Sequence, residues 1–269
     1  MLLLISDLDD TLVSQTESLV ADKDLDNFNT IWKNQLLPQN SRLVYNTGRS
    51  VALFYELFNK KQLLLPDYLI CGVGTEVYSF TPDSKLEKLQ QWTDIVLEDF
   101  RLEHVKLVTQ QWISSGLLRL QSESENSEVK LSFYFDPQQV EYIETKIVPN
   151  LKASLVSVNI IVSVQHGVGH LDILPVKANK GTAAMWLREY LGFPPQLTMV
   201  CGESMNDYDM FFSSSPQVLR VAVGNCEENV RKKFLQLSKV DNHFYLASRH
   251  FAGGIVEGLH HFAFLSGSC

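Results

Sequence analysis

The sequence predicts an α/β protein in which a doubly wound parallel sheet carries an inserted α+β domain. Two observations predict this fold class. Short continuous apolar runs alternate with helical patterns toward both ends of the chain, whereas the middle shows period-2 alternation instead. The chain has 269 residues, of which 45% are hydrophobic. This is enough to fill the core of one large domain, or of a domain that carries a smaller inserted one.

Five apolar runs have the length of buried strands, and each ends in turn or polar residues: Leu2–Ser6, Leu43–Thr47, Leu69–Val73, Leu197–Cys201 and Leu219–Val223. Continuous apolar runs are typical of parallel strands that are covered on both faces. One helical stripe follows Ser50, and another ends at Gly192, which is suited to a helix C-cap. Alternating strands and helices predict a Rossmann-like core whose active groups lie beyond the carboxyl ends of the strands.

The middle of the chain predicts a different kind of structure. Ser84 and Glu87 can form a capping box, which predicts a helix that begins near residue 84. Period-2 alternation predicts half-exposed antiparallel strands on both sides of a polar hairpin loop at Gln121–Glu128; these strands are Leu117–Gln121, Val129–Phe135 and Val158–Val164. We therefore expect a core made of residues 1–79 and 177–269 and an inserted cap domain at residues 80–176.

The formal net charge of −8 argues against a nucleic-acid or anionic-membrane partner, because both reward clustered basic residues. The apolar start, Met1–Ile5, is too short for a signal peptide, and we expect no membrane-spanning segment. The four cysteines form no C-x-x-C pair, which favours reduced thiols. We expect a soluble, cytoplasmic, monomeric protein. If it handles an anionic substrate, its site needs a cation.

Two carboxylates follow the first predicted strand, at Asp7 and Asp9. A D-x-D at a strand end can direct two carboxylates into one pocket, so that one attacks a substrate while the other manages protons. The plainer alternative for this pattern alone is a solvated turn that caps the next helix.

Three further polar segments lie in comparable positions. Thr47 and Gly48 offer a hydroxyl and a helix N-terminus to a phosphate oxygen. Lys180 can reach a phosphate as a point charge. Glu203 and Asp207 offer the hard oxygen ligands that suit Mg²⁺. Each segment alone is as well explained by an N-cap, a surface lysine or a polar loop. Their placement just past strand ends of one domain favours a common phosphate site.

This order of groups resembles the haloacid-dehalogenase superfamily of phosphatases, whose motifs match Asp7-x-Asp9-x-Thr11, Thr47, Lys180 and the Gly202–Asp207 loop. A closer resemblance is to the sucrose-phosphate phosphatases. It is carried by Leu4–Asp9, Thr47–Ser50, Pro66–Ile70, Gly74–Tyr78, Leu171–Pro175 and a tail that includes Ala247–His250, Gly253–Gly254 and Glu257. Two positions depart from that family: Glu203 stands where Asp is usual, and His170 stands where a second acidic residue is common.

The resemblance implies a magnesium-dependent phosphatase that acts on sucrose 6-phosphate through an aspartyl phosphate. It implies Asp7 as nucleophile, Asp9 as general acid and base, and Thr47 and Lys180 as phosphate-binding groups. Mg²⁺ is then held by Asp7, the Asp9 carbonyl and Glu203, with Asp207 acting through water or orienting Lys180. The implied substrate contacts are Leu8, Gly48, Arg49 and Asn206 in the core, and Lys130 and Asp172 in the cap domain.

Other functions remain open at this stage. The substrate can be another glycosyl phosphate, such as mannosylfructose phosphate or trehalose phosphate, or the reaction can be that of a sugar phosphomutase. Signalling receiver domains also combine acids, a Thr and a Lys, but they are shorter, carry no inserted domain and do not need Asp9. A non-catalytic partner of a sucrose-phosphate synthase is favoured only by Glu203. The presence of Asp7, Asp9, Thr47 and Lys180 favours an active enzyme.

Overall fold

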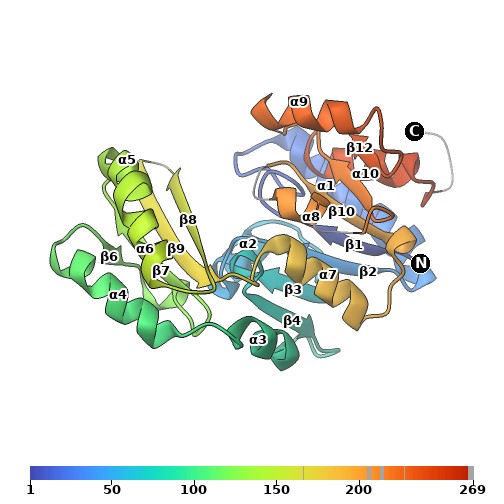
Figure 1. Cartoon of the computed structure of the whole chain (residues 1–269). Helices are drawn as coiled ribbons and strands as arrows, with labels where there is room; N and C mark the ends of the chain where they lie inside the picture. The colour runs from blue at the N-terminus through green and yellow to red at the C-terminus, as the bar shows by residue number, and fades with distance from the viewer. Residues whose placement is uncertain (166, 205–206, 213–214, 227, 266–269) are drawn as a thin grey trace. The chain divides into compact units, whose positions relative to one another are not determined.

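The computed structural model describes residues 1–165, 167–204, 207–212, 215–226 and 228–265. The chain divides into two compact units (Figure 1). Met1–Lys88 and Lys180–Cys269 form one, named here the core unit, and Leu89–Asn179 form the other, named the cap unit. Each unit is described by itself.

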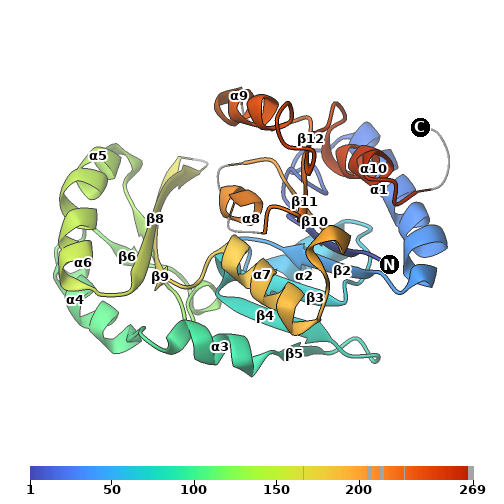
Figure 2. The ribbon, with the colours of Figure 1, turned by 45° about the vertical axis from the view of Figure 1, so that its right-hand side comes forward.

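The core unit is built on an eight-stranded sheet of order β12-β11-β10-β1-β2-β3-β4-β5 (Figure 2). The strands from β12 to β3 are parallel, whereas β4 and β5 run antiparallel to their neighbours. The bounds are β1 Leu3–Ser6, β2 Arg42–Asn46, β3 Tyr68–Cys71, β4 Glu76–Phe80, β5 Leu86–Lys88, β10 Thr198–Gly202, β11 Leu219–Ala222 and β12 Phe244–Leu246. The five predicted strands are all present, close to their predicted bounds.

Helices cover both faces of this sheet. On one face, a hydrophobic cluster joins Leu4 and Tyr45 of the strands to Phe28 of α1, Phe54 of α2 and Ile255 of α10. On the other face, Asn46 of β2 contacts Lys180 and Met210. The helices are α1 Leu19–Ile31, α2 Val51–Lys60, α7 Lys180–Tyr190, α8 Tyr208–Phe212, α9 Glu228–Leu237 and α10 Phe251–His261. The predicted Rossmann-like doubly wound core is confirmed.

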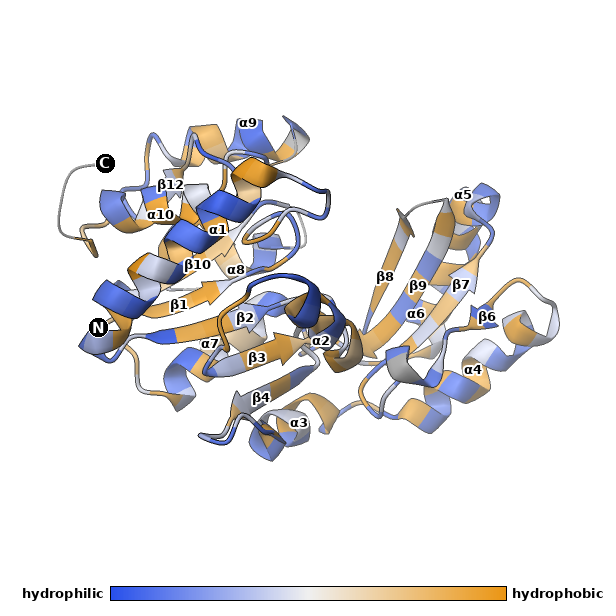
Figure 3. Ribbon diagram, turned by 180° about the vertical axis from the view of Figure 1, so that it is seen from behind, coloured by the Kyte–Doolittle hydropathy of each residue, from blue (hydrophilic) through white to orange (hydrophobic). Residues whose placement is uncertain are grey.

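Strands β1 and β3 are largely hydrophobic, and β2 is hydrophobic between the polar residues at its two ends (Figure 3). Every residue of β1 is buried, as are the last four residues of β2. Burial on both faces explains why these strands lack period-2 alternation. Because parallel strands end at the same sheet edge, the residues after β1, β2 and β10 lie side by side.

The cap unit contains a four-stranded antiparallel sheet of order β6-β7-β9-β8. One face packs on helices through a cluster that includes Phe133, Leu171 and Leu151. The opposite face carries Tyr134 paired with His170, and Ser132 paired with Asp172. The bounds are α3 Gln90–Leu97, α4 Leu102–Ser114, β6 Arg119–Leu120, β7 Leu131–Phe135, α5 Val140–Tyr142, α6 Val148–Ser154, β8 Val158–Gln165 and β9 Val168–Pro175.

The helix predicted from residue 84 is wrong. Ser84 lies in the turn of the β4–β5 hairpin with a positive φ of 62°, and its N–H donates to the Thr81 carbonyl. Leu86–Lys88 pairs with β4, and the helix begins only at Gln90. Because β5 completes the large sheet, the division between the units falls at residues 88/89 and 179/180, rather than at 79/80 and 176/177.

Among the described residues, no helix combines the length and the apolar composition needed to cross a bilayer. Three of the four cysteines, Cys71, Cys201 and Cys226, are buried, and no disulfide joins them to one another. Cys269 lies outside the described residues.

Candidate active site

The nucleophile candidate Asp7 follows β1 directly. Its N–H donates to the Cys201 carbonyl of β10 at 3.0 Å, which extends the parallel ladder one residue beyond the strand. This bond fixes the backbone of Asp7 at the carboxyl edge of the sheet. The residue is only 4% exposed. A buried carboxylate at this position needs partners, because an unpaired buried charge is strongly disfavoured.

Lys180 supplies one partner. Its Nζ lies 2.8 Å from Asp7 Oδ1 and 2.8 Å from Asp207 Oδ1, and its side chain is 5% exposed. Lys180 is the first residue of α7, and the Asn46 amide donates to its carbonyl at 2.9 Å. The next residue, Gly181, packs so closely on α8 that a Cβ would approach the Asp209 carbonyl oxygen to 2.2 Å. These contacts fix the helix start that carries the ammonium.

Asp207 is fully buried and organises the loop after β10. Its Oδ2 accepts hydrogen bonds from the N–H groups of Glu203 and Ser204, at 3.0 and 3.2 Å, and from the Ser204 hydroxyl at 3.2 Å. Its other oxygen accepts from Lys180. Both carboxylate oxygens are thus used to shape the loop and hold the ammonium. The contact with Asp207 fixes the position of the Lys180 ammonium.

Glu203 reaches the same cluster despite its longer side chain. Its carboxylate accepts a hydrogen bond from the Thr11 hydroxyl, and one oxygen each from Asp7, Glu203 and Asp207 all lie within 4.8 Å of one another. Three convergent carboxylates are hard oxygen donors of the kind that Mg²⁺ prefers. The donor set therefore fits the predicted magnesium, with Asp7, Glu203 and Asp207 as the residues able to hold it.

The pKa values of the clustered groups reflect their burial and the charges of their neighbours. Burial, together with the neighbouring charge of Asp207, raises the pKa of Asp7 to about 7 and that of Glu203 to about 10. Burial also opposes the charge of Lys180 and of Asp207, but their ion pair more than offsets it. The Lys180 pKa is therefore raised, and that of Asp207 is lowered.

Asp9 is held by Arg49. The guanidinium donates from Nε to Asp9 Oδ2 at 2.7 Å and from Nη2 to Oδ1 at 2.6 Å, a bidentate arrangement. The backbone N–H of Arg49 also donates to the hydroxyl of Thr47 at 3.1 Å, and Thr47 is fully buried beside β1. Sequence reasoning assigned Arg49 to the substrate and did not foresee this pair.

The cap unit brings its two predicted sugar contacts together. Lys130 Nζ lies 3.6 Å from Asp172 Oδ1, and both side chains are less than one-fifth exposed. Next to them, His170 Nδ1 lies 3.2 Å from the Gln121 amide, and its ring meets Tyr134 edge-on. Asn206, the remaining predicted substrate contact, lies outside the described residues.

The sequence analysis did not identify some of the residues that shape this site. Asn46 and Ser204 bond to the Lys180 carbonyl and to Asp207, respectively. A buried asparagine in an apolar strand directly before Thr47 was a usable signal for the first, because a buried amide must find partners.

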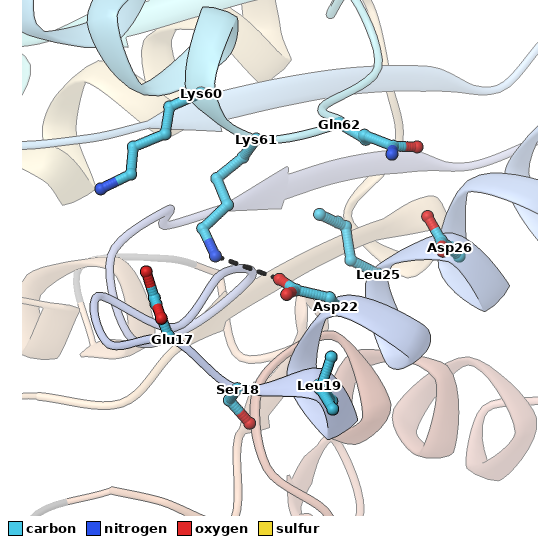
Figure 4. A pocket seen from close by; sticks show the side chains of 9 residues that line it. All are labelled: Glu17, Ser18, Leu19, Asp22, Leu25, Asp26, Lys60, Lys61 and Gln62. Atoms are coloured by element: carbon cyan, nitrogen blue, oxygen red, sulfur yellow. Dashed lines mark hydrogen bonds and ion pairs between the residues drawn. The ribbon is translucent and has the colours of Figure 1, made fainter.

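A separate cavity of about 580 Å³ lies beside α1 and α2 (Figure 4). Acidic and basic side chains face each other across it, and Lys61 Nζ bonds to Asp22 Oδ1 at 3.0 Å. Its lining contains none of the residues of the carboxylate cluster: Glu17, Ser18, Leu19, Asp22, Leu25, Asp26, Lys60, Lys61 and Gln62.

The comparison with known families decides the relationship. A family model described as sucrose-6F-phosphate phosphohydrolase matches residues 1–263. The chain belongs to this family. A probable sucrose-phosphatase 2 from Arabidopsis thaliana is 33% identical over 267 residues, which are 97% of this chain and 59% of that protein. The chain therefore spans less than two thirds of the length of this relative. A mannosylfructose-phosphate phosphatase from Agrobacterium fabrum is 27% identical, with 96% of each chain covered.

A solved structure extends the likeness to three dimensions. The sucrose-phosphatase of Synechocystis sp. PCC6803, in complex with sucrose and phosphate, matches with a TM-score of 0.77 and 31% identity. The match covers 98% of this chain and 99% of that one. Both the core and the inserted region of the present chain thus have counterparts in that protein.

Proposed function

We propose that this chain hydrolyses sucrose 6-phosphate to sucrose and phosphate through an aspartyl phosphate on Asp7. The observation that carries the proposal is the pairing of a buried strand-end carboxylate, Asp7, with the buried ammonium of Lys180 at 2.8 Å. Family membership supports phosphate-ester hydrolysis. The likeness to a sucrose-phosphatase that binds sucrose and phosphate supports the substrate.

In the first step, Asp7 attacks phosphorus in line with the departing sugar oxygen. Lys180 offsets charge on the phosphoryl oxygens while Asp207 holds its Nζ in place. The Thr47 hydroxyl and the N–H groups of Leu8 and Gly48 take the remaining oxygens. Asp7, the Asp9 carbonyl and Glu203 would hold magnesium, with Asp207 acting through water or orienting Lys180, and the ion would supply the positive charge that the acidic cluster lacks. Because the Asp7 carboxylate is a weak nucleophile, positioning and electrostatics must provide most of the acceleration of the reaction.

Asp9 transfers the protons. It protonates the leaving sugar oxygen and then takes a proton from the water that hydrolyses the aspartyl phosphate. The bidentate bond to Arg49 occupies both carboxylate oxygens of Asp9, so the carboxylate must turn away from the guanidinium to transfer a proton. On this proposal, Arg49 reaches the substrate only when Asp9 has left it.

The cap unit supplies sugar recognition in this proposal. Lys130 and Asp172 lie on the face of its sheet opposite its hydrophobic cluster, together with Ser132 and His170. Paired charges and amides of this kind suit the hydroxyl groups of a sugar. Asn206 of the loop after β10 completes the proposed substrate contacts.

The test is phosphate release from sucrose 6-phosphate, with magnesium or with a chelator, by wild type, Asp7→Asn and Asp22→Asn. Asp22 is a matched control, because it is an ion-paired aspartate at the separate cavity. We expect magnesium-dependent turnover by wild type and Asp22→Asn and none by freshly prepared Asp7→Asn. Robust activity in Asp7→Asn would refute the covalent mechanism.

Two other glycosyl phosphates belong in the same assay. Preferred release from mannosylfructose phosphate, the substrate class in the name of one relative, or from trehalose phosphate would correct the substrate alone. Transfer of phosphate to a sugar in excess of free phosphate would indicate a mutase instead.

We also propose that the chain acts as a monomer in the cytoplasm and that a sucrose-phosphate synthase is a candidate partner. Light scattering of the purified protein, alone and mixed with such a synthase, tests the monomeric state and the binding of the synthase. A stable dimer of the chain alone would refute the first.

A further inference from the structure

The tail motif that contains Ala247–His250 and Glu257 has no part in the proposed chemistry, yet it connects to the catalytic turn through one side chain. That side chain is Asn225, in the loop after β11. We infer that Asn225 is a positioning residue that holds the turn after Asp7 and Asp9 against the start of α10. The inference rests on the proposed function for its catalytic consequence only.

The turn itself has an unusual backbone. The N–H of Asp10 donates to the Val13 carbonyl at 2.8 Å, and the N–H groups of Leu12 and Val13 donate to the Leu8 carbonyl at 3.0 and 2.9 Å. Asp10 has a φ of +56°, in the left-handed region that non-glycine residues rarely adopt. Such a conformation persists only where surrounding contacts enforce it.

Asn225 provides such a contact. Its Nδ2 donates to the Asp10 carbonyl at 2.6 Å, and its Oδ1 accepts from the Phe251 N–H at 3.0 Å. Phe251, the first residue of α10, also has a positive φ, of +49°. If the Asn225 amide were flipped, its Nδ2 would face the Phe251 N–H and its Oδ1 would face the Asp10 carbonyl. The two contacts therefore fix the orientation of the amide. The side-chain amide of Asn225 therefore links Asp10 and Phe251, two residues with left-handed backbone conformations from opposite ends of the sequence.

The loop that carries Asn225 is itself held by the tail. The Gly224 N–H donates to the Arg249 carbonyl at 2.8 Å, and a Cβ on Gly224 would lie 2.5 Å from the Ser248 carbonyl oxygen. Glu257 accepts from the N–H groups of Ser248 and Arg249, and Arg249 pairs with Asp24 of α1. These contacts with the tail hold the loop that carries Asn225 in place.

The consequence concerns Asp9. Its carbonyl and carboxylate lie in the segment that Asn225 tethers from one side, while Arg49 holds the carboxylate from the other. Without the Asn225 tether, Asp10 is expected to relax from its left-handed conformation and to shift Asp9. Asn225 itself does not touch the reacting atoms, so it acts through the turn.

The test compares Asn225→Ala with Asn29→Ala, whose amide also donates to a backbone carbonyl, that of Gln62 at 2.7 Å, but beside the separate cavity. We expect similar changes in Tm for both. For Asn225→Ala alone we expect kcat to fall at least tenfold with KM within about twofold of wild type. We also expect faster amide hydrogen exchange over residues 8–13.

Asn225→Asp separates the two contacts, since it keeps an acceptor for the Phe251 N–H and loses the donor to Asp10. It serves as the second variant should the alanine variant fold poorly, and a similar loss of kcat is expected. Unchanged exchange over residues 8–13, or a kcat within about twofold of wild type in a folded variant, would overturn the inference. Failure of wild type to hydrolyse any sugar phosphate would instead refute the proposed function, while the exchange measurement would still test the tether.

Discussion

Replacement of Lys180 by Met provides the most direct test of the buried charge arrangement. Lys180 is bonded to Asp7 and Asp207 at 2.8 Å each, and the three side chains are at most 6% exposed. Methionine fills a similar volume but removes the charge. The variant therefore leaves two buried carboxylates without their cation, and nearby Glu203 adds a third acidic group.

The magnitude follows from the class of interaction. Removing one partner of a buried ion pair costs about 3–5 kcal/mol, because the other charge stays buried and uncompensated. Against a typical total stability of about 5–15 kcal/mol, this is a large fraction. We therefore expect the metal-free Lys180→Met protein to lose about 3–5 kcal/mol at pH 7.5.

The loss should shrink on acidification. Without the ammonium, the pKa of Asp207 in the folded variant rises above its unfolded value near 4, and the pKa of Asp7, which burial already raises to about 7, rises further. Between about pH 4 and the raised pKa values, the folded variant binds more protons than the unfolded chain. Its stability then increases as the pH falls, which narrows the difference from wild type.

The assay is urea unfolding in the presence of a chelator at pH 7.5 and pH 5.5, with free energies taken from the midpoint and slope. Lys85→Met serves as control, because its pair with Asp83 is 77% and 60% exposed and should contribute nothing measurable. Adding Asp207→Asn to Lys180→Met should restore about 1 kcal/mol or more. A loss below about 1 kcal/mol at pH 7.5, with no pH dependence, would refute the reasoning.

Three further predictions concern the metal site, the tail and helix packing. Because burial raises the pKa of Asp7 to about 7 and that of Glu203 to about 10, the metal-free protein should lose stability as the pH rises from about 4.5 to 7. The increase in Tm caused by Mg²⁺ should grow over the same range, and an equal increase at pH 5 and pH 8 would contradict this. Burial opposes the charge of Glu257, but bonds from Tyr245, Ser248 and Arg249 lower its pKa, so Glu257→Gln should lower the Tm at pH 7 and approach wild type as the pH falls through that lowered pKa. A difference that persists at low pH would refute a charge effect. Gly258→Ala should cost about 1–3 kcal/mol, because its Cβ would lie 2.5 Å from Val221 Cγ2 of β11, and an unchanged urea midpoint would show that α10 can shift.

The sequence predicts the core well because burial leaves a simple pattern. Strands such as β1 are covered on both faces, so they appear as uninterrupted apolar runs, and their carboxyl ends locate the polar residues that follow. Asp7, Lys180, Glu203 and Asp207 were all identified by this placement, together with the family resemblance. The structure brings the four together.

Contacts between segments that are far apart in the sequence leave no pattern in it comparable to the apolar runs of the strands. Ser84 satisfies a capping-box spacing, but the pairing of β5 with β4 overrides it. The Arg49–Asp9 pair spans 40 positions, and the Asn225–Asp10 bond spans 215. Neither follows from local periodicity, because each depends on which strand ends are neighbours in the sheet. Strand β9 was not predicted, although polar His170 and Asp172 alternate with buried residues, which is the pattern of a half-exposed strand.

On the proposed function, the charge of the cluster explains how an acidic protein can bind an anionic ester. When Asp7, Glu203 and Asp207 are all ionised, they outweigh Lys180 by two negative charges, and a phosphate entering the metal-free site would meet net repulsion. Burial, together with the neighbouring negative charge, raises the pKa values of Asp7 and Glu203. A divalent cation removes that excess without protonating the nucleophile. Metal and phosphate binding must therefore favour each other, and by reciprocity phosphate should tighten magnesium binding by the same factor.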